Sequence, residues 1–223
     1  MYKIISDSAC DLSQAYIEKN NIGIVPLSVS FDGETYYRDG IDITRNECYK
    51  RMVENPGVYP KTSLPSVEQY ANVFEEYAKT NTPVVCFTIS LIFSGSFNSA
   101  MNARELVLED YPDAEIHVID SKQNTVTQAL IIDQMVRMQK ADLPLDLALK
   151  NIEKVIDSAR IFFTVGSLDY LQMGGRIGKV AAAAGKIDVK PVIIMKNGDI
   201  GLGGIGRNRN KLKKKVLSVA DKY

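Results

Sequence analysis

The chain alternates short apolar runs with stretches in which apolar residues recur at helical spacing. The runs predict strands at residues 3–6, 23–27, 84–88 and 115–119. Helical spacing predicts helices from 13 to about 19, from 66 to 78, after 96, and from about 125 and 144 onward. This alternation is typical of an α/β fold whose strands are mostly parallel and joined by right-handed crossovers.

Local signals support several of these elements. Thr44 with Glu47, and Ser66 with Gln69, have the form of capping boxes, and Ser13 can cap the first helix. Asp32-Gly33, flanked by 29–31 and 35–37, indicates a two-residue hairpin turn. The run 84–88 is apolar throughout, as expected of a strand buried on both faces.

The pattern changes beyond residue 159. Strands are expected at 161–165, 189–195 and 200–202, with a short helix at 167–173, and glycine becomes dense. We therefore divide the chain into a Rossmann-like lobe at 1–159 and a second, smaller lobe at 160–223.

Composition narrows the class of protein. The chain has 45% apolar and 24% charged residues, with 27 basic against 27 acidic side chains, so no net field favours nucleic acid. No apolar run approaches the ~20 residues that span a bilayer. The start lacks the pattern of a signal peptide, and three scattered cysteines form neither a disulfide framework nor a zinc pattern. The expected compartment is the cytoplasm.

Acid–base and metal chemistry have little support. The single histidine, His117, lies inside a predicted strand, no G-x-S-x-G sequence accompanies it, and Cys86 reads as a core residue. Asp7, Asp11, Asp39 and Asp42 could hold magnesium, although caps and turns explain them more simply. No metal site and no catalytic residue are assigned.

Three hydroxyl-rich loops, at 6–11, 62–66 and 94–96, follow strands or extended segments and precede helices. Ligands of open α/β sheets bind beyond the carboxyl ends of the strands, where helix N-termini favour anions. Ser13 and Ser66 are explained as caps. Thr62 lies four residues ahead of its capping box and Ser94 precedes a glycine, so these two are candidate anion ligands, although caps and turns would account for them as well.

A further unusual stretch, 168–177, ends in Gly174-Gly175-Arg176-Ile177. Paired glycines before an arginine indicate a helix stop that directs the guanidinium toward a particular place, with an ordinary surface arginine as the alternative.

These segments, taken in order, resemble the DegV family of fatty-acid-binding proteins. The matching motifs are Ile5-Ser6-Asp7-Ser8 with Asp11-Leu12, Thr62-Ser63-x-Pro65-Ser66, Ser94-Gly95-Ser96 with Ser99-Ala100, residues 118–122, Leu171-x-x-Gly174-Gly175-Arg176-Ile177, and Lys190-Pro191-Val192. No single motif is specific, but six in register over residues 4–192 make the resemblance strong.

The resemblance implies a function. Members of the family have a Rossmann-like lobe and a smaller mixed α/β lobe, and they carry a long-chain fatty acid such as palmitate in a tunnel between the two. Thr62 and Ser94 match the hydroxyls that bind the carboxylate. Arg176 matches a rim arginine linked to a separate fatty-acid kinase, which phosphorylates the bound acid. The expected protein is therefore a bacterial lipid-binding carrier, not an enzyme, with the fatty acid as ligand and no cofactor.

The chain also departs from the family. Members normally continue past the point matching Tyr223, with further strands of the second lobe and a histidine near the carboxylate for which His117 cannot substitute. The second lobe is therefore expected to be incomplete. The strand at 189–195 would then present an unpaired edge and an uncovered apolar face, which predicts a homodimer or a leaky tunnel.

Two other interpretations stay open. A small-molecule phosphotransferase or hydrolase could use the same anion-binding loops, with Asp7 as base or metal ligand, although neither a P-loop nor G-x-G-x-x-G follows a strand. The basic stretch 207–215 could bind RNA or a lipid surface, but its interleaved apolar residues favour the solvated face of a terminal helix.

Overall fold

The fold was analysed in a computed structural model that describes residues 1–178, 180 and 190–222. The chain forms two compact units, Met1–Ala159 and Arg160–Tyr223. Among the described residues, no sheet is shared between the two units.

The first unit is built on a parallel sheet of four strands in the order β2-β1-β6-β7. The strands are β1 (Lys3–Asp7), β2 (Gly23–Val25), β6 (Val84–Thr88) and β7 (Ile116–Asp120). All three pairings between them are parallel, which confirms the predicted mixed α/β fold with a parallel sheet.

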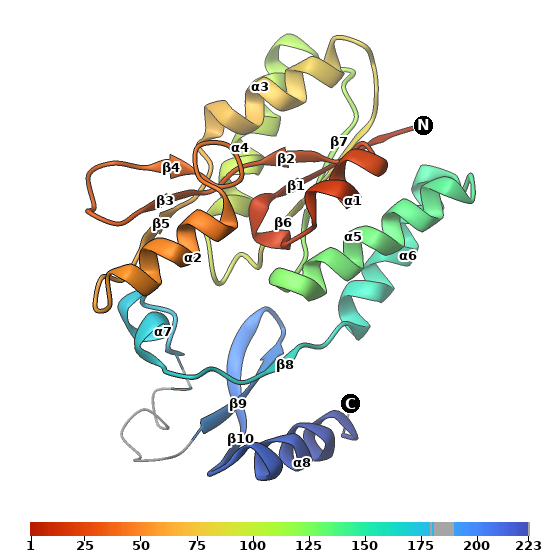
Figure 1. The fold of residues 1–223 in the computed structure, drawn as a ribbon. Coiled ribbons are helices and arrows are strands. Elements are labelled where there is room, and N and C mark those ends of the chain that lie inside the picture. The colour runs from red at the N-terminus through yellow and green to blue at the C-terminus, as the bar shows by residue number, and fades with distance from the viewer. Residues whose placement is uncertain (179, 181–189, 223) are drawn as a thin grey trace. The chain divides into compact units, whose positions relative to one another are not determined.

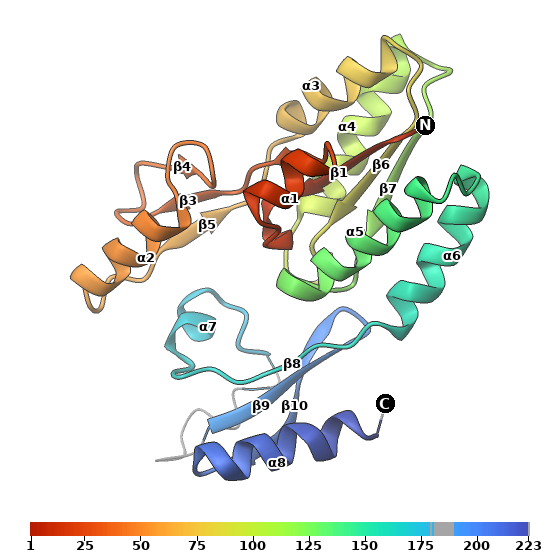
Figure 2. The same ribbon diagram turned by 45° about the vertical axis from the view of Figure 1, so that its right-hand side comes forward.

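Helices cover both faces of this sheet (Figures 1 and 2). One face packs against α3 (Val67–Ala78) and α4 (Ser96–Asp110), and the other against α5 (Thr125–Lys140) and α6 (Leu145–Ser158). The 3₁₀ turn η1 (Ser8–Cys10) and α1 (Gln14–Lys19) follow β1 and lie on the α5 side.

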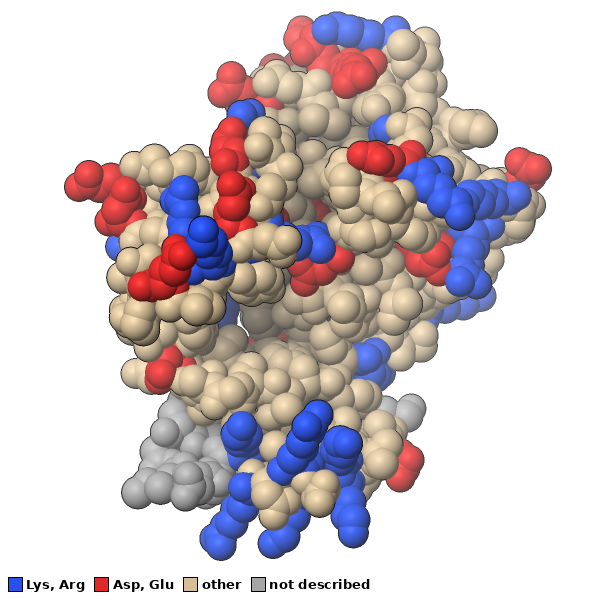
Figure 3. All heavy atoms as spheres, in the orientation of Figure 1, with Lys and Arg blue, Asp and Glu red and all other residues tan. Residues whose placement is uncertain are grey.

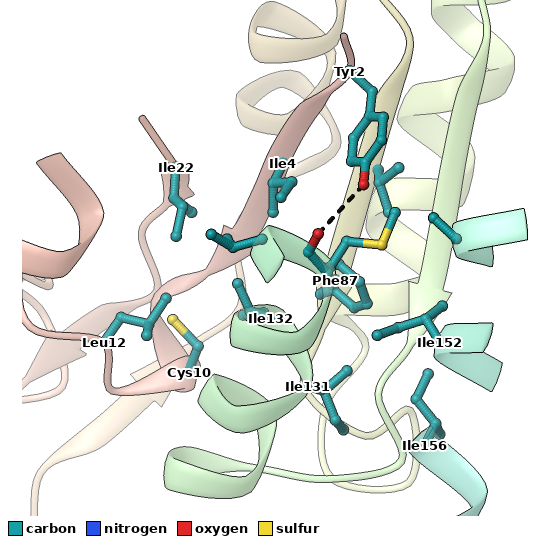
Figure 4. Packing of buried hydrophobic residues seen from close by; sticks show 14 residues of the cluster. Tyr2, Ile4, Cys10, Leu12, Ile22, Phe87, Ile131, Ile132, Ile152 and Ile156 are labelled. Atoms are coloured by element: carbon teal, nitrogen blue, oxygen red, sulfur yellow. Dashed lines mark hydrogen bonds between the residues drawn. The ribbon is translucent and has the colours of Figure 1, made fainter. Parts of the chain in front are cut away.

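Alternation along β1 and β6 divides the core into two layers. Ile4, Val85 and Phe87 face the α5 side, whereas Ile5 and Cys86 face the α3 side. Figure 4 shows the α5 side, where the Tyr2 hydroxyl donates to the Met135 carbonyl oxygen at 3.3 Å. The run at 84–88 is buried in every residue, as the sequence predicted.

The predicted caps are present. Ser66 begins α3 and Thr44 begins α2 (Arg45–Glu54), each in a complete capping box, and the Ser13 hydroxyl accepts the N–H of Tyr16 at the start of α1. Each cap satisfies main-chain donors that the first helical turn leaves unpaired.

The first unit also contains a small antiparallel sheet with the strand order β4-β3-β5. Its strands come between β2 and β6 along the chain. It consists of β3 (Ser28–Ser30), β4 (Tyr37–Arg38) and β5 (Lys61–Ser63). The predicted hairpin exists, but its loop spans 31–36 and is longer than two residues. Asp32 Oδ1 accepts the N–H groups of Glu34 and Thr35, and this local turn lengthens the connection.

The described residues of the second unit form the sheet β10-β9-β8 and the helices α7 and α8. Its elements are β8 (Phe162–Phe163), α7 (Asp169–Met173), β9 (Lys190–Lys196), β10 (Asp199–Gly206) and α8 (Arg209–Ala220). The prediction that the strand at 189–195 presents an unpaired edge is wrong at Ile193 and Ile194, which pair with Phe163 and Phe162 of β8. β9 pairs with β10 on one side and with β8 on the other. Val189 itself lies outside the described residues.

Helix α8 packs on β10 and leaves its basic side chains in solvent. Leu212 and Val219 are buried, whereas Lys211, Lys213 and Lys214 are exposed. Figure 3 shows lysine and arginine side chains gathered over this helix. The stretch is therefore the solvated face of a terminal helix, as its spacing indicated.

Among the residues that the structure describes, no helix is both long enough and apolar enough to cross a membrane.

Candidate functional site

A cavity of about 340 Å³ opens in the first unit, where the loop after β1 meets β3, β5 and the start of α5. Its wall combines aliphatic, hydroxyl and charged side chains. The lining residues are Ser8, Ala9, Asp11, Leu27, Ser28, Val29, Asp39, Arg45, Cys48, Tyr49, Pro60, Thr62, Ile89, Asn124 and Thr125. A small cavity of this composition can hold a polar head group while its aliphatic residues contact an apolar chain.

Thr62 lies in this cavity wall, as a ligand-binding hydroxyl must. It is the central residue of β5, paired in register with Val29 of β3, and its side chain is exposed. The short sheet fixes the main chain of Thr62. Because the side chain is exposed, no free energy is lost in burying its hydroxyl. This position is an available hydrogen-bond donor.

Ser94 lies in the loop between β6 and α4, beside the segment that carries Thr62. A methyl group on Gly95 would be only 3.3 Å from Leu64 Cδ2, and Ser99 donates to the Pro65 carbonyl oxygen at 2.8 Å. The Ser94 hydroxyl is 2.9 Å from that of Ser96. The fold thus brings the two predicted segments together, although Ser94 does not line the cavity as Thr62 does.

Asp7, at the carboxyl end of β1, is fully buried behind the cavity. Its carboxylate accepts the Ile89 N–H at 2.8 Å and the Gln128 amide at 2.9 Å. Burial raises the pKa of Asp7 to about 6 against these hydrogen bonds, which lower it. A carboxylate occupied in this way has no exposed oxygen with which to act as a base on a substrate.

Asn124 and Thr125 are functional candidates that the sequence did not reveal. They form the start of α5 and line the same cavity as Thr62. Thr125 has a φ of 43°, which is strained for a β-branched residue, and Asn124 Oδ1 is buried without a hydrogen-bond partner among the described residues. Neither property can be predicted from the spacing of residues in the sequence, because both depend on where the helix begins in the fold.

Charge at the cavity is mixed. Arg45 donates to the Leu12 carbonyl oxygen at 2.8 Å, which holds the guanidinium at the wall shared with Asp11 and Asp39. Burial raises the pKa of Asp11, whereas Arg45 lowers it and Asp39 raises it. The arginine offsets the two acids, so the site does not repel an incoming anion as strongly as the acids alone would.

Arg176 lies in the second unit, directly after the paired glycines. Gly175 has a φ of 70°, and the N–H groups of Gly175 and Arg176 bond to the carbonyls of Gln172 and Leu171. This is a Schellman motif, so the predicted helix stop is confirmed. The guanidinium is exposed and donates to the Gly174 carbonyl oxygen.

The residues set aside by the sequence analysis are placed as expected. His117 is a partly exposed strand residue with Nε2 2.8 Å from Glu115 Oε1, and Cys86 is fully buried, which raises the pKa of its thiol. Within the described ranges, no group of three or more histidine, cysteine, aspartate or glutamate side chains is arranged to hold a metal ion.

Comparison with known proteins identifies relatives along the full chain. The model of the DegV family matches residues 1–223. A DegV domain-containing protein of Clostridium perfringens is 33% identical over 86% of this chain, which spans 66% of the length of that relative. A stearic acid-binding protein from Eubacterium ventriosum has a solved structure that is 71% identical, with a TM-score of 0.95 over 100% of this chain and 76% of that one.

A second solved structure, of a fatty-acid-binding DegV family protein from Thermus thermophilus, is 27% identical. Its TM-score is 0.88, over 99% of this chain and 77% of that one. Both likenesses extend over nearly all of this chain and confirm the architecture derived from its own elements.

Proposed function

Because this chain belongs to the DegV family, we propose that it binds one long-chain fatty acid and holds the carboxylate in the first unit, at residues 1–159. The observation that carries the proposal is Thr62, an exposed hydroxyl on a fixed strand in the wall of a cavity that also has aliphatic lining. The 71% identity to a stearic acid-binding protein supports the same ligand class.

The acyl tail and the head group have different roles in binding. Burying a sixteen-carbon tail at ~0.8 kcal/mol per CH₂ gives roughly 12 kcal/mol of gross driving force. A hydrogen bond to a charged carboxylate contributes only ~1.5–3 kcal/mol. The tail therefore supplies most of the affinity, whereas Thr62 and Ser94 orient the molecule and select the acid head group.

The protein acts as a carrier in this proposal and catalyses no reaction itself. A separate fatty-acid kinase phosphorylates the carboxylate of the bound acid, and Arg176 belongs to the surface that the kinase contacts. Support comes from the match between Leu171-x-x-Gly174-Gly175-Arg176-Ile177 and the family motif, and from the Schellman motif that fixes the main chain before Arg176. The carrier role requires no cofactor.

Native mass spectrometry of the purified protein tests the proposal. The expected result is a mass increment of one fatty acid, which is lost after extraction with organic solvent and regained after incubation with stearate. A chain that retains no acyl mass and takes up none from added stearate would overturn the proposal. A retained nucleotide or metal in place of the lipid would favour the phosphotransferase or hydrolase.

A further inference from the structure

Asp7 connects three segments that meet behind the cavity. Its carboxylate, at the end of β1, accepts the N–H of Ile89 in the loop after β6 and the side-chain amide of Gln128 in α5. Ala9 and Ile89 line the cavity that contains Thr62, whereas Asp7 does not. The carboxylate therefore contacts the cavity wall from its buried side.

The contact with Ile89 also fixes the path of the chain toward Ser94. Ile89 is followed by Ser90, whose N–H bonds to the Gln123 carbonyl oxygen at 2.9 Å and whose own carbonyl accepts the Ser94 N–H at 3.1 Å. A shift of Ile89 would displace Ser90, which follows it in the chain. The Ser90 carbonyl oxygen would move as well, and with it the Ser94 N–H that it accepts.

Burying the Asp7 carboxylate costs free energy unless hydrogen-bond donors stabilise its charge. Asp7 and Gln128 are each 0% exposed, and an ionised carboxylate in such a place is stabilised only by the donors that surround it. Every donor named above belongs to a segment at the cavity. A core built only for stability would fill this place with an apolar side chain.

We propose that Asp7 is a positioning residue for head-group binding, because its buried carboxylate holds Ile89 at the cavity wall and keeps Ser94 beside the Thr62 segment. This inference rests on the proposed function and assigns a role to a residue that does not touch the ligand. It predicts that the loss of Asp7 disturbs binding even in protein that remains folded.

The conservative variant has a distinct expectation. In Asp7→Asn, the amide oxygen still accepts the Ile89 N–H, and the new NH₂ group faces Gln128. Gln128 Oε1 has no hydrogen-bond partner among the described residues, so a flip of the Gln128 amide lets it accept from the new group. Asparagine therefore preserves the positioning, whereas alanine removes it.

The experiment measures stearate affinity by displacement of a fluorescent long-chain fatty acid, at a temperature where each variant is folded by circular dichroism. We expect Asp7→Ala to raise the Kd at least tenfold and Asp7→Asn to stay within threefold of the wild type. Asp133→Ala is the matched control, because Asp133 accepts from Tyr16 and Arg137 in the same unit and none of these three residues lines the cavity. Its melting temperature should fall while its Kd stays unchanged.

Wild-type affinity in folded Asp7→Ala, or losses in Asp133→Ala that match those in Asp7→Ala, would overturn the inference. If Asp7→Ala does not fold, hydrogen exchange at the Ile89 amide of the wild-type protein decides. Slow exchange supports a held amide, and exchange as fast as that of exposed loop amides contradicts it. Failure of the wild-type protein to bind stearate would instead refute the proposed function, so the two failures are distinguishable.

Discussion

At the residue scale, the site depends on a few polar groups whose environments differ sharply. Thr62 is exposed at the cavity wall, Ser94 is half-buried in a hydroxyl pair, and Asp7 is completely enclosed. Under the proposed function, Thr62 and Ser94 meet the ligand, and Asp7 holds the Ile89 N–H and the Gln128 side-chain amide. Each position leads to its own expectation.

Removal of either head-group hydroxyl should weaken lipid binding and leave the fold intact. We expect Thr62→Val and Ser94→Ala each to cost about 1–3 kcal/mol of fatty-acid affinity, because a carboxylate loses a donor. Fluorescent fatty-acid titration measures the change. Ser63→Ala is the control, since Ser63 is the exposed neighbour of Thr62 outside the cavity wall. Unaltered affinity in both site variants would remove these residues from the site.

The buried carboxylate of Asp7 predicts a dependence of stability on pH. Its folded-state pKa of about 6 lies above the ordinary value of 3.8, so between these values the folded protein binds more protons than the unfolded chain. The contribution of Asp7 to the free energy of unfolding is therefore present at pH 4 and is lost as the pH rises through 6. The loss amounts to about 3 kcal/mol, at roughly 1.4 kcal/mol per pKa unit.

Asp7→Asn lacks this titration. Relative to the wild type, we expect its free energy of unfolding to increase by roughly 2.4 kcal/mol between pH 4 and pH 7.5. Urea denaturation of both proteins at the two pH values measures this difference, in which the titration of all other groups cancels. Parallel pH profiles of the two proteins would show that Asp7 keeps an ordinary pKa in the fold.

At the element scale, local capping holds the helices that cover the sheet. The Ser66 hydroxyl accepts the Gln69 N–H at 3.1 Å at the start of α3, the helix that buries Tyr70 and Phe74 in the core. We expect Ser66→Ala to lower the free energy of unfolding by about 0.5–2 kcal/mol. Ser218→Ala, at an exposed position inside α8, should change it by a few tenths of a kcal/mol at most. Equal effects of the two changes in urea denaturation would contradict the capping role.

The elements that could be predicted from the sequence are those whose signal is local. Neighbouring residues alone are enough to recognise the strand at 84–88 and the capping boxes at Thr44 and Ser66. The structure has all three at the predicted positions. Strand β5 could not be predicted, because all three of its residues are exposed and it pairs with β3, which lies about thirty residues earlier, with Val29 opposite Thr62.

The residues of the candidate site likewise divide into those that a local sequence signal reveals and those that depend on contacts far apart in the chain. Thr62 was identified from its offset to a cap, which is a local feature. The burial of Asp7 was not, because its partner Gln128 is separated from it by 121 positions and no spacing rule connects the two. The edge predicted for the strand at 189–195 is closed at Ile193 and Ile194 for a related reason, since Phe162 and Phe163 pair with them across a long separation in the chain.

At the scale of the whole molecule, binding and presentation are assigned to different units. Thr62 and Ser94 lie in residues 1–159 and Arg176 in the unit that begins at Arg160. We expect Arg176→Ala to leave lipid affinity within a few tenths of a kcal/mol, because exposed charged contacts are weak. Phosphorylation of the bound lipid by a reconstituted fatty-acid kinase should nevertheless fall.

Arg207→Ala, at another exposed arginine of the second unit, is the matched control and should change neither readout. Parallel losses of lipid affinity and phosphorylation in Arg176→Ala would instead place Arg176 on the carboxylate. The comparison of the two assays therefore separates a contact with the kinase from a contact with the ligand.

The packing of α8 on β10 has a consequence for how this chain can diverge in its lineage. A Cβ on Gly203 would lie 2.8 Å from Ile194 Cγ2, and one on Gly206 would lie 2.9 Å from Leu212 Cγ. Any single-nucleotide change that gives either glycine a side chain adds atoms where none fit, whereas Lys211, Lys213 and Lys214 of α8 tolerate exchange because their side chains are exposed. Purifying selection should therefore preserve the glycines of β10 and permit substitutions at the exposed lysines of α8. Descendants of this chain would then be most alike at glycines, which have no functional side chain.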